Sequence, residues 1–559
     1  MSRREFTSSP FAAAAWLAIL CAGCTADTPC VAGSTQICVG AGRCEGVQIC
    51  EDDGQRFGPC DCEGGPDGGL ADAQVPDAEV PDADRPDGGA RRHIALDTLK
   101  AFPSAFGAGR DLTGGRGGEI YEVTNLNDSG PGSLREAVLA RGPRVIIIKV
   151  EGRIDARSPL YAGAEENGDC TIWGQLAPGR GLTWSGDRFE FRNNTNVIIR
   201  HLSSQTRDPA HAGTWDSLII DEPAEGGGFY LEHNSFRYGM DEAFGVYSKF
   251  ASNRSTIAYN LGAESIEGHN TGIILGNSAA LYPSGDFTFA RNMFYNISHR
   301  FPNVGAGNEA VFEVYENYIV NWQQRLTRSN GPVRIDYFHN YAQKGNHGFG
   351  SAHPVNKWVY RSDWTSMRIF SDFNFVSEWA ETPSANQQNI WVYRNDVPEL
   401  GAMQGDPLPS SYFVTERQGD YDLPPAGLWD TMDVPANVMA SVGHNRGVDA
   451  DGSPGFFRDD LDARYVERAS TGTTEADYRT SAEWTDSTFT GTALYADGDG
   501  DHMPDWFEAQ HAHLDPAVPD GADTHVDWDF GDFTVSNDAG YTNLEICAEY
   551  YAGGFEAMR

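Results

Sequence analysis

The most regular feature of the chain is a short run of β-branched and aromatic residues that ends in asparagine. Such runs predict short strands, and the asparagine that closes each run predicts a turn. The clearest copies end at Asn234, Asn260, Asn292, Asn317 and Asn340, and weaker copies end at Asn374 and Asn395. The first five asparagines are 26, 32, 25 and 23 residues apart.

This irregular period is typical of a β-solenoid whose coils carry loops of different lengths. A propeller would need a regular blade of about 40–45 residues, and a leucine-rich repeat would need its leucine pattern. Asparagines that recur at one corner of a solenoid can stack into a hydrogen-bonded ladder. We therefore expect an all-β solenoid in the middle of the chain.

The N-terminus is typical of an export signal. The basic segment Ser2–Phe6 contains an arginine pair and precedes an apolar run, Phe11–Cys24, that is too short to span a bilayer. The arginine pair followed by Phe6 resembles a twin-arginine signal. Leu20–Cys24 resembles a lipobox with Cys24 as the lipidated residue, which predicts a lipoprotein with residues 1–24 as its signal. An ordinary cleaved signal and a chance apolar stretch are the alternatives.

The next segment is rich in cysteine. Six of the ten cysteines lie in residues 25–62, at Cys30, Cys38, Cys44, Cys50, Cys60 and Cys62. In an exported chain such a cluster predicts a disulfide framework, and the pairing stays open. Zinc is the alternative, but the segment has no histidine and no paired CxxC. Two further cysteines, Cys170 and Cys547, lie in the folded regions, and the sequence leaves open whether they are free or paired.

A linker and a strong acidic excess complete the composition. Residues 63–92 repeat Pro-Asp and Gly, which cannot build a core.

The 559-residue chain has 80 acidic and 41 basic residues, a net charge of −39. This charge argues against a nucleic-acid partner, which needs a basic face. An anionic substrate would have to meet a local basic cluster or a bound cation.

Several motifs occur in the order found in one known family. They are Ala101–Pro103, Thr113–Glu119, Val123–Arg135, Gly174–Gly179, Asn196–Arg200 and Leu231–Phe236. Together they resemble the pectate-lyase-like proteins of polysaccharide lyase family 1, over residues 101 to about 340. The resemblance implies a right-handed parallel β-helix, which we place at residues 93–485. It also implies a lyase that cleaves an acidic polysaccharide, pectin or polygalacturonate, by calcium-assisted β-elimination.

The same resemblance implies a calcium region on neighbouring coils. Asp216 opens a strand similar to the family's D-A-L-x-I, and Asp241 and Glu242 resemble its G-T-D-E. We expect these three as metal ligands, because Ca²⁺ prefers carboxylate oxygens. Glu232 stands where the family has Asp. Gly245 stands where some members have a further acid, so the calcium can be resident or can arrive with the substrate.

Basic residues follow on later coils. Arg300 resembles the first arginine of the family's R-x-P-x-x-R, and Gly305 replaces the second. Arg300 is our candidate catalytic residue, either as the proton acceptor or as a fixed cation. His269 is the second catalytic candidate, because the family often has Lys or His there. His299, Arg325 and Arg328 are candidates for substrate binding.

The C-terminal region, residues 486–559, carries a second calcium pattern. Twelve residues from Asp497 to Glu508 have acids at positions 1, 3, 5, 9 and 12, the spacing of an EF-hand-type loop. These acids are Asp497, Asp499, Asp501, Asp505 and Glu508. His502 replaces the usual glycine, and Asn537–Glu545 resembles a degraded second loop. The region is similar to dockerin-like or thrombospondin-type modules, and we expect it to be structural.

The sequence thus predicts an exported, monomeric polysaccharide lyase. We expect it outside the cell or on the outer membrane, touching a membrane only through its lipid anchor. A non-catalytic glycan-binding β-helix and a lyase for another uronate polymer are the alternatives. A β-helix glycoside hydrolase would need a pair of acids at the matching coils, and none appears.

Overall fold

The chain divides into two units, Met1–Gly88 and Gly89–Arg559. In the first unit the computed structural model describes only a hairpin of β1 (Thr35–Val39) and β2 (Glu45–Ile49). In the second unit it describes residues 91–206, 215–221, 224–265, 270–277, 280–322, 325–344, 360–362, 366–377, 388–393, 395–472 and 485–559. The export signal, the linker and the pairing of the six clustered cysteines lie outside the described residues.

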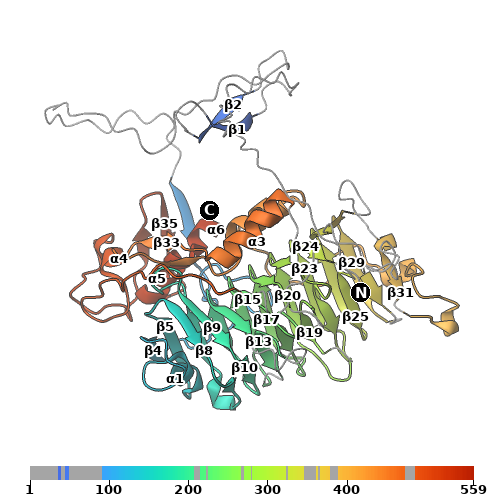
Figure 1. Ribbon diagram of the computed structural model, residues 1–559, viewed down its shortest axis with the longest axis horizontal. Helices are drawn as coiled ribbons and strands as arrows, with labels where there is room; N and C mark the ends of the chain where they lie inside the picture. Colours follow the sequence, from blue (N-terminus) through green and yellow to red (C-terminus); the bar gives the residue numbers. More distant parts are fainter. Residues whose placement is uncertain are drawn as a thin grey trace, which may run out of the picture. The chain divides into compact units, whose positions relative to one another are not determined.

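The second unit is built from three parallel sheets (Figure 1). Sheet 1 contains β7 (Leu160–Ala162), β10 (Phe189–Arg192), β13 (Leu218–Asp221), β16 (Gly245–Tyr247), β19 (Ile274–Gly276), β22 (Asn303–Gly305), β25 (Thr327–Asn330), β28 (Tyr360–Ser362) and β31 (Trp391–Tyr393). Sheet 2 contains β4 (Glu119–Val123), β5 (Arg144–Ile148), β8 (Cys170–Trp173), β11 (Val197–Arg200), β14 (Phe229–Glu232), β17 (Arg254–Ala258), β20 (Asp286–Ala290), β23 (Val311–Tyr315), β26 (Arg334–Phe338) and β29 (Arg368–Asp372). Sheet 3 contains β6 (Gly152–Asp155), β9 (Leu182–Gly186), β12 (Ser203–Thr206), β15 (Ser235–Arg237), β18 (Leu261–Ala263), β21 (Met293–Tyr295), β24 (Tyr318–Trp322), β27 (Tyr341–Lys344) and β30 (Phe375–Val376).

The order of these strands defines coils. The chain passes from sheet 1 to sheet 2 to sheet 3 and then returns to sheet 1, one strand further along. Each strand pairs in parallel with its counterpart on the next coil, as β14 does with β17 and β17 with β20. This is the parallel β-helix that the sequence predicts, and the prediction is confirmed.

The interior of the β-helix is a stack of apolar side chains in register. In sheet 2, Ile172 lies beside Ile199, which lies beside Leu231, and that row continues to Ile257 and Phe289. All five are buried in one continuous core. Because each coil adds an apolar residue at the same position, the core is continuous from coil to coil, and no coil can bury its apolar face alone.

The predicted asparagine ladder lies at the corner between sheets 2 and 3. The Nδ2 amide of each asparagine donates to the Oδ1 atom of the next, over 2.9–3.1 Å. The residue before each asparagine has a positive φ, so the chain turns there in the left-handed region. The rungs are Asn234, Asn260, Asn292, Asn317, Asn340 and Asn374. The weaker copy at Asn374 is thus a true rung.

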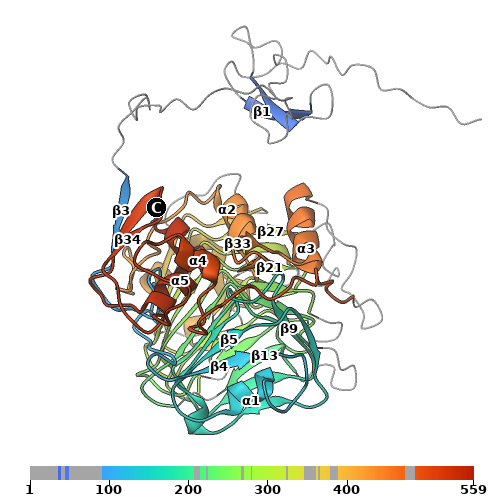
Figure 2. The ribbon, with the colours of Figure 1, turned by 90° about the vertical axis from the view of Figure 1, so that its left-hand side faces the viewer.

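Helix α1 (Leu134–Leu139) covers the first end of the β-helix (Figure 2). Ser133 caps it by accepting a hydrogen bond from the backbone N–H of Glu136, and Leu134, Ala137 and Val138 are buried. Beside it the guanidinium of Arg144, fully buried, donates to five backbone carbonyls. These bonds satisfy carbonyls at the end of α1 and in the turns that precede β5 and β8.

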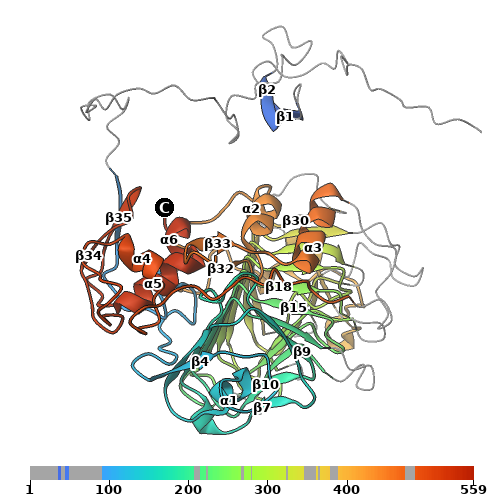
Figure 3. The same ribbon diagram turned by 60° about the vertical axis from the view of Figure 1, so that its left-hand side comes forward.

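Helices α2 (Val434–Ser441) and α3 (Asp460–Thr471) pack on the outer face of sheet 3 (Figure 3). At their base the buried Arg237 guanidinium donates to Asp462 and Asp459, each at 2.6 Å. Three-residue 3-10 helices occur at Glu165–Asn167, Gln388–Ile390, Pro398–Leu400 and Ser410–Tyr412. A β-ribbon of β32 (Arg446–Val448) and β33 (Pro454–Phe456) joins α2 to α3.

The C-terminal segment packs on the first strands of sheet 2. It contains α4 (Asp505–Ala509), α5 (Asn543–Ala552) and α6 (Gly554–Ala557), and its strands β34 (Asp527–Asp529) and β35 (Phe533–Ser536) form a sheet with β3 (Arg92–Ala95). Its apolar residues share one core with Val145, Ile147 and Trp173. Cys170 and Cys547 are buried free thiols. Among the described residues, no helix has the length and apolarity needed to cross a membrane.

We predict that the ladder sets the stability of the coils. Asn292→Ala removes the acceptor for both the backbone N–H and the side-chain amide of Asn260. Unsatisfied buried donors cost about 1–3 kcal/mol each, so for the two donors we expect a loss of about 2–6 kcal/mol. Urea unfolding followed by circular dichroism measures it. Asn127→Ala, at an exposed asparagine outside the ladder, is the matched control, and an equal shift in both variants would contradict the prediction.

Candidate active site

Three acidic side chains meet at the edge of sheet 1 where β13 and β16 begin. Asp216 precedes β13, and Asp241 and Glu242 precede β16 on the next coil. One carboxylate oxygen of each lies within 4.8 Å of the others. Two ligands of one Ca²⁺ ion, each about 2.4 Å from it, are at most about 4.8 Å apart. The donor set and its spacing therefore fit the calcium ion that the sequence predicts here.

Burial and crowding of charge define this group. Asp216 is 3% exposed, and its Oδ1 atom accepts the backbone N–H of Glu242 over 2.8 Å. Burial, and then the neighbouring charge of Asp241, raise the pKa of Asp216 well above its usual range, while Arg300 lowers it. A cation near these carboxylates would relieve the same repulsion.

Gly245 leaves room for this arrangement. A Cβ atom at Gly245 would lie 2.7 Å from Asp216 Oδ2 and 2.7 Å from the ring of Tyr247. The place where some family members carry a further acid is therefore filled by the carboxylate of Asp216. The pKa of Tyr247 is raised by burial and by the charges of Asp216 and Asp241, so its hydroxyl stays protonated beside them.

Later coils continue the row in register. Parallel bridges join Glu242 to Thr271, Thr271 to His299, and His299 to Arg325. The Thr271 hydroxyl donates to the backbone carbonyl of Asp241 over 2.8 Å. The β-helix thus places residues from four successive coils in one line, with carboxylates at one end and basic side chains at the other.

Arg300 lies between the two ends. It has a φ of 75° and its guanidinium forms an ion pair with Glu242. Burial lowers the pKa of Arg300, while the carboxylates of Asp241 and Asp216 raise it. Arg300 is therefore a cation held close to the acidic group at the cost of its own solvation.

The second arginine of the family motif cannot be accommodated. Gly305 lies in β22, and a Cβ atom there would lie 2.2 Å from the backbone carbonyl of Asn277. The basic residues beyond Arg300 come instead from the next coil. Arg325 is buried beside His299, and Arg328 pairs in β25 with Asn303 of β22. His269 lies outside the described residues.

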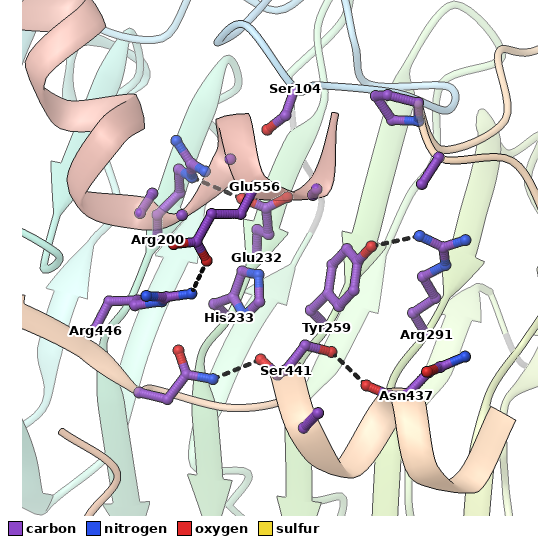
Figure 4. A pocket seen from close by; sticks show the side chains of 18 of the residues that line it. Ser104, Arg200, Glu232, His233, Tyr259, Arg291, Asn437, Ser441, Arg446 and Glu556 are labelled. Atoms are coloured by element: carbon purple, nitrogen blue, oxygen red, sulfur yellow. Dashed lines mark hydrogen bonds and ion pairs between the residues drawn. The ribbon is translucent and has the colours of Figure 1, made fainter. Parts of the chain in front are cut away.

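Glu232 is not part of this group. It ends β14 in sheet 2, where its carboxylate accepts from Arg200 Nε over 2.7 Å. Burial raises the pKa of Glu232 to about 7. It lines a separate cavity of about 370 Å³ together with His233, Tyr259 and Arg291 (Figure 4). His233 stacks on Tyr259 with ring centroids 4.7 Å apart.

The five acids of the C-terminal loop belong to the segment that packs on sheet 2. Asp497, Asp499 and Asp501 come together, and Asp501 also meets Glu508. Asp505 instead accepts the backbone N–H of Gly498 over 2.6 Å. Sequence reasoning missed Asp520, which joins Asp501 and Glu508, and it missed Thr271 and Tyr247 on sheet 1. Neither Thr271 nor Tyr247 stands in a motif; only the pairing of coils brings them to the site.

The comparisons with known proteins agree with the resemblance. No family model matches the chain. It is 35% identical over 228 residues to a "probable pectate lyase C" of Aspergillus terreus, covering 41% of this chain and 49% of that protein. A "probable pectate lyase C" of Neosartorya fischeri is 34% identical over 228 residues, again 41% and 49%. The chain therefore spans about half the length of the curated relatives it matches.

Solved structures with a similar course include two pectate lyases and an allergen. The thermostable pectate lyase PL 47 has a TM-score of 0.39 at 16% identity, over 62% of this chain and 98% of that one. A pectate lyase bound to a hexasaccharide has a TM-score of 0.39 at 14% identity, over 62% and 98%. The cedar pollen allergen jun a 1 has a TM-score of 0.37 at 16% identity, over 61% and 92%.

We predict that Gly245→Ala disturbs the acidic group without unfolding the β-helix. The added methyl would press on the Asp216 carboxylate and on Tyr247. A displacement of about 1 Å can cost about 100-fold in rate, so we expect a loss of about 10- to 100-fold in any turnover that depends on this acidic group. A thermal unfolding curve checks that the fold is retained. Unchanged turnover in a folded variant would show that the position of Asp216 does not matter.

Proposed function

We propose that this protein is a lyase that cleaves uronate polymers of the polygalacturonate type by calcium-assisted β-elimination. The observation that carries the proposal is that Asp216, Asp241 and Glu242 meet on adjacent coils, and that Arg300, two coils beyond Glu242, forms an ion pair with it. The likeness to probable pectate lyases over this part of the chain supports it.

The reaction needs a base and a sink for negative charge. The proton on the carbon next to the uronate carboxylate is removed, and its electron pair forms a double bond to the neighbouring carbon. The glycosidic C–O bond on that neighbour breaks, and its oxygen leaves with a proton. Because the proton is weakly acidic, the charge that develops on the carboxylate side has to be neutralised.

The side chains divide this work. Arg300 holds or accepts the proton, or stabilises the anion as a fixed cation. Asp216, Asp241 and Glu242 would hold Ca²⁺, which supplies neutralising charge at the substrate carboxylate when bound. Glu242 belongs to the acidic group and also forms an ion pair with Arg300, so it links the two.

The basic residues beyond Arg300 favour a polymer over a single sugar acid. In a chain of net charge −39, His299 lies two coils beyond Glu242, on the coil of Arg300, and Arg325 and Arg328 lie on the coil after that. Adjacent coils are about 4.8 Å apart, so this row extends the site across several sugar residues. An acidic polysaccharide lying across the coils would meet them in turn.

The remaining proposals concern location. The signal pattern of residues 1–24 supports an exported lipoprotein anchored through Cys24, on the outer membrane or the cell surface, with the β-helix acting as a monomer on extracellular polysaccharide. In sequence, the cysteine-rich segment and the acidic linker lie between Cys24 and the β-helix.

We expect an ultraviolet-absorbing unsaturated product from polygalacturonate in the presence of calcium, and its loss on addition of a chelator. Methylated pectin and rhamnogalacturonan are the parallel substrates. Product from none of the three would reject the pectinase proposal and leave a glycan-binding β-helix or a lyase for another uronate polymer.

Variants of Arg300 test its role. Arg300→Ala should lower kcat by about 10²- to 10⁴-fold, the contribution typical of a positioned proton-transfer or charge-stabilising group. Arg300→Lys keeps the charge, and partial recovery would favour a fixed cation. Arg334→Ala, at an exposed ion pair on sheet 2, is the control and should keep full turnover. Equal turnover in Arg300→Ala and the control would contradict the assignment.

A further inference from the structure

A second acidic group lies in the C-terminal segment, and its carboxylates come from two separate loops. Asp501 and Glu508 belong to the loop 497–508, whereas Asp520 belongs to the connection before β34. One oxygen of each lies within 4.8 Å of the others, the span that a single Ca²⁺ ion allows. Asp501 is also within this distance of Asp499.

The oxygens of this group point to a missing ligand. Glu508 is fully buried, and neither of its carboxylate oxygens has a hydrogen-bond partner. The same holds for one buried oxygen each of Asp499 and Asp520. Burying an ionised carboxylate without a partner is costly. Among the described residues, no basic side chain forms an ion pair with Asp499, Asp501, Glu508 or Asp520; Lys149 pairs with the neighbouring Asp497 instead.

The other acids of the loop are occupied elsewhere. Asp497 Oδ2 lies 3.1 Å from Lys149 Nζ in an ion pair. Asp505 Oδ1 accepts the backbone N–H of Gly498 over 2.6 Å. His502 takes the positive φ that the sixth position of such a loop requires and bonds through Nδ1 to Glu122, 2.9 Å away. The carboxylates that come together therefore differ from those of the twelve-residue sequence pattern. Asp497 and Asp505 are engaged elsewhere, and Asp520, from outside the loop, joins the group.

The group holds several segments together. Asp501 Oδ2 accepts the backbone N–H groups of Asp520 and Gly521. Gly521 in turn accepts the backbone N–H of Leu544 in α5 through its carbonyl, and the Asn543 amide donates to the Asp520 carbonyl. The carboxylates thus sit where the acidic loop, the 520 segment and the start of α5 converge.

Helix α5 carries this connection into the β-helix. Its Glu549 accepts from Arg200 Nη1 of β11 over 2.7 Å and from the backbone N–H of Ser104 over 2.9 Å. Its apolar face shares a core with Val145, Ile147 and Trp173. A change at the start of α5 would therefore reach the first coils of sheet 2.

We propose that Asp499, Asp501, Glu508 and Asp520 bind one structural Ca²⁺ ion that clamps the C-terminal segment onto the first coils of the β-helix. This ion is distinct from the one proposed at Asp216, and it binds without substrate. It neutralises the buried carboxylates and so favours the folded arrangement of α5 and the two loops.

Calcium titration of the full-length protein tests the clamp without any polysaccharide, so its result is independent of the lyase assay. The titration uses the Asp216→Asn protein, in which the acidic group at sheet 1 has lost one carboxylate. Metal is first removed by a chelator, and CaCl₂ is then added in a calorimeter. We expect one bound ion, and a rise of several degrees in the thermal midpoint on adding calcium, with a smaller rise for Mg²⁺.

Asp520→Asn should weaken calcium binding at least about tenfold and abolish most of the thermal shift. Asp538→Asn, at an exposed acid of the degraded second loop, removes the same charge and should leave both unchanged. Glu508→Gln should lower calcium binding more than Asp520→Asn does. Asp520→Asn, at a half-buried site, still tests the clamp if Glu508→Gln does not fold. The clamp is overturned if calcium neither binds nor stabilises, or if Asp520→Asn behaves like the control.

Discussion

Hydrogen bonds between buried asparagine amides hold the coils of this β-helix in register from Asn234 to Asn374, and the arrangement of the candidate site depends on that register. The asparagines are 23 to 34 residues apart in sequence, yet every rung between them is 2.9–3.1 Å long. Differences in coil length therefore have to be absorbed at the other two corners. Since one corner is fixed, a loop elsewhere can lengthen without shifting the apolar rows of the core.

The candidate site is a direct consequence of this register. Glu242, Thr271 and His299 come from three different coils, and parallel bridges place them in one line. A loop site would have to order each residue separately, whereas here the order is inherited from the strands. The chemistry follows the same line, because the carboxylates stand on the earlier coils and the basic residues on the later ones. Arg300 lies where the two meet and contacts Glu242.

The parts of this arrangement that a local pattern encodes were predictable. The ladder, the parallel coils and the acidic residues Asp216 and Asp241 could be predicted because each lies in a short motif. Gly245 shows the limit: its motif indicated a missing acid, but only the structure shows that the carboxylate of Asp216 fills the space. Asp520 lies outside any motif, and its partners Asp501 and Glu508 are brought to it by the folding of a second loop. Long-range pairing of this kind leaves no periodic trace in a sequence.

The two acidic groups differ in how their charge is balanced, and this difference separates their roles. At sheet 1 the protein supplies a cation of its own, because Arg300 pairs with Glu242 and its charge offsets that of Asp216. Under the proposed function, calcium would join a group whose charge is already partly offset. At the C-terminal loop the oxygens of Glu508 are buried and unpartnered, and no ion pair among the described residues reaches them. Burying a group of that kind without a cation is costly, so the proposed ion would stabilise the folded segment. Calcium would therefore take part in the proposed reaction at sheet 1 and would stabilise the fold at the C-terminal segment.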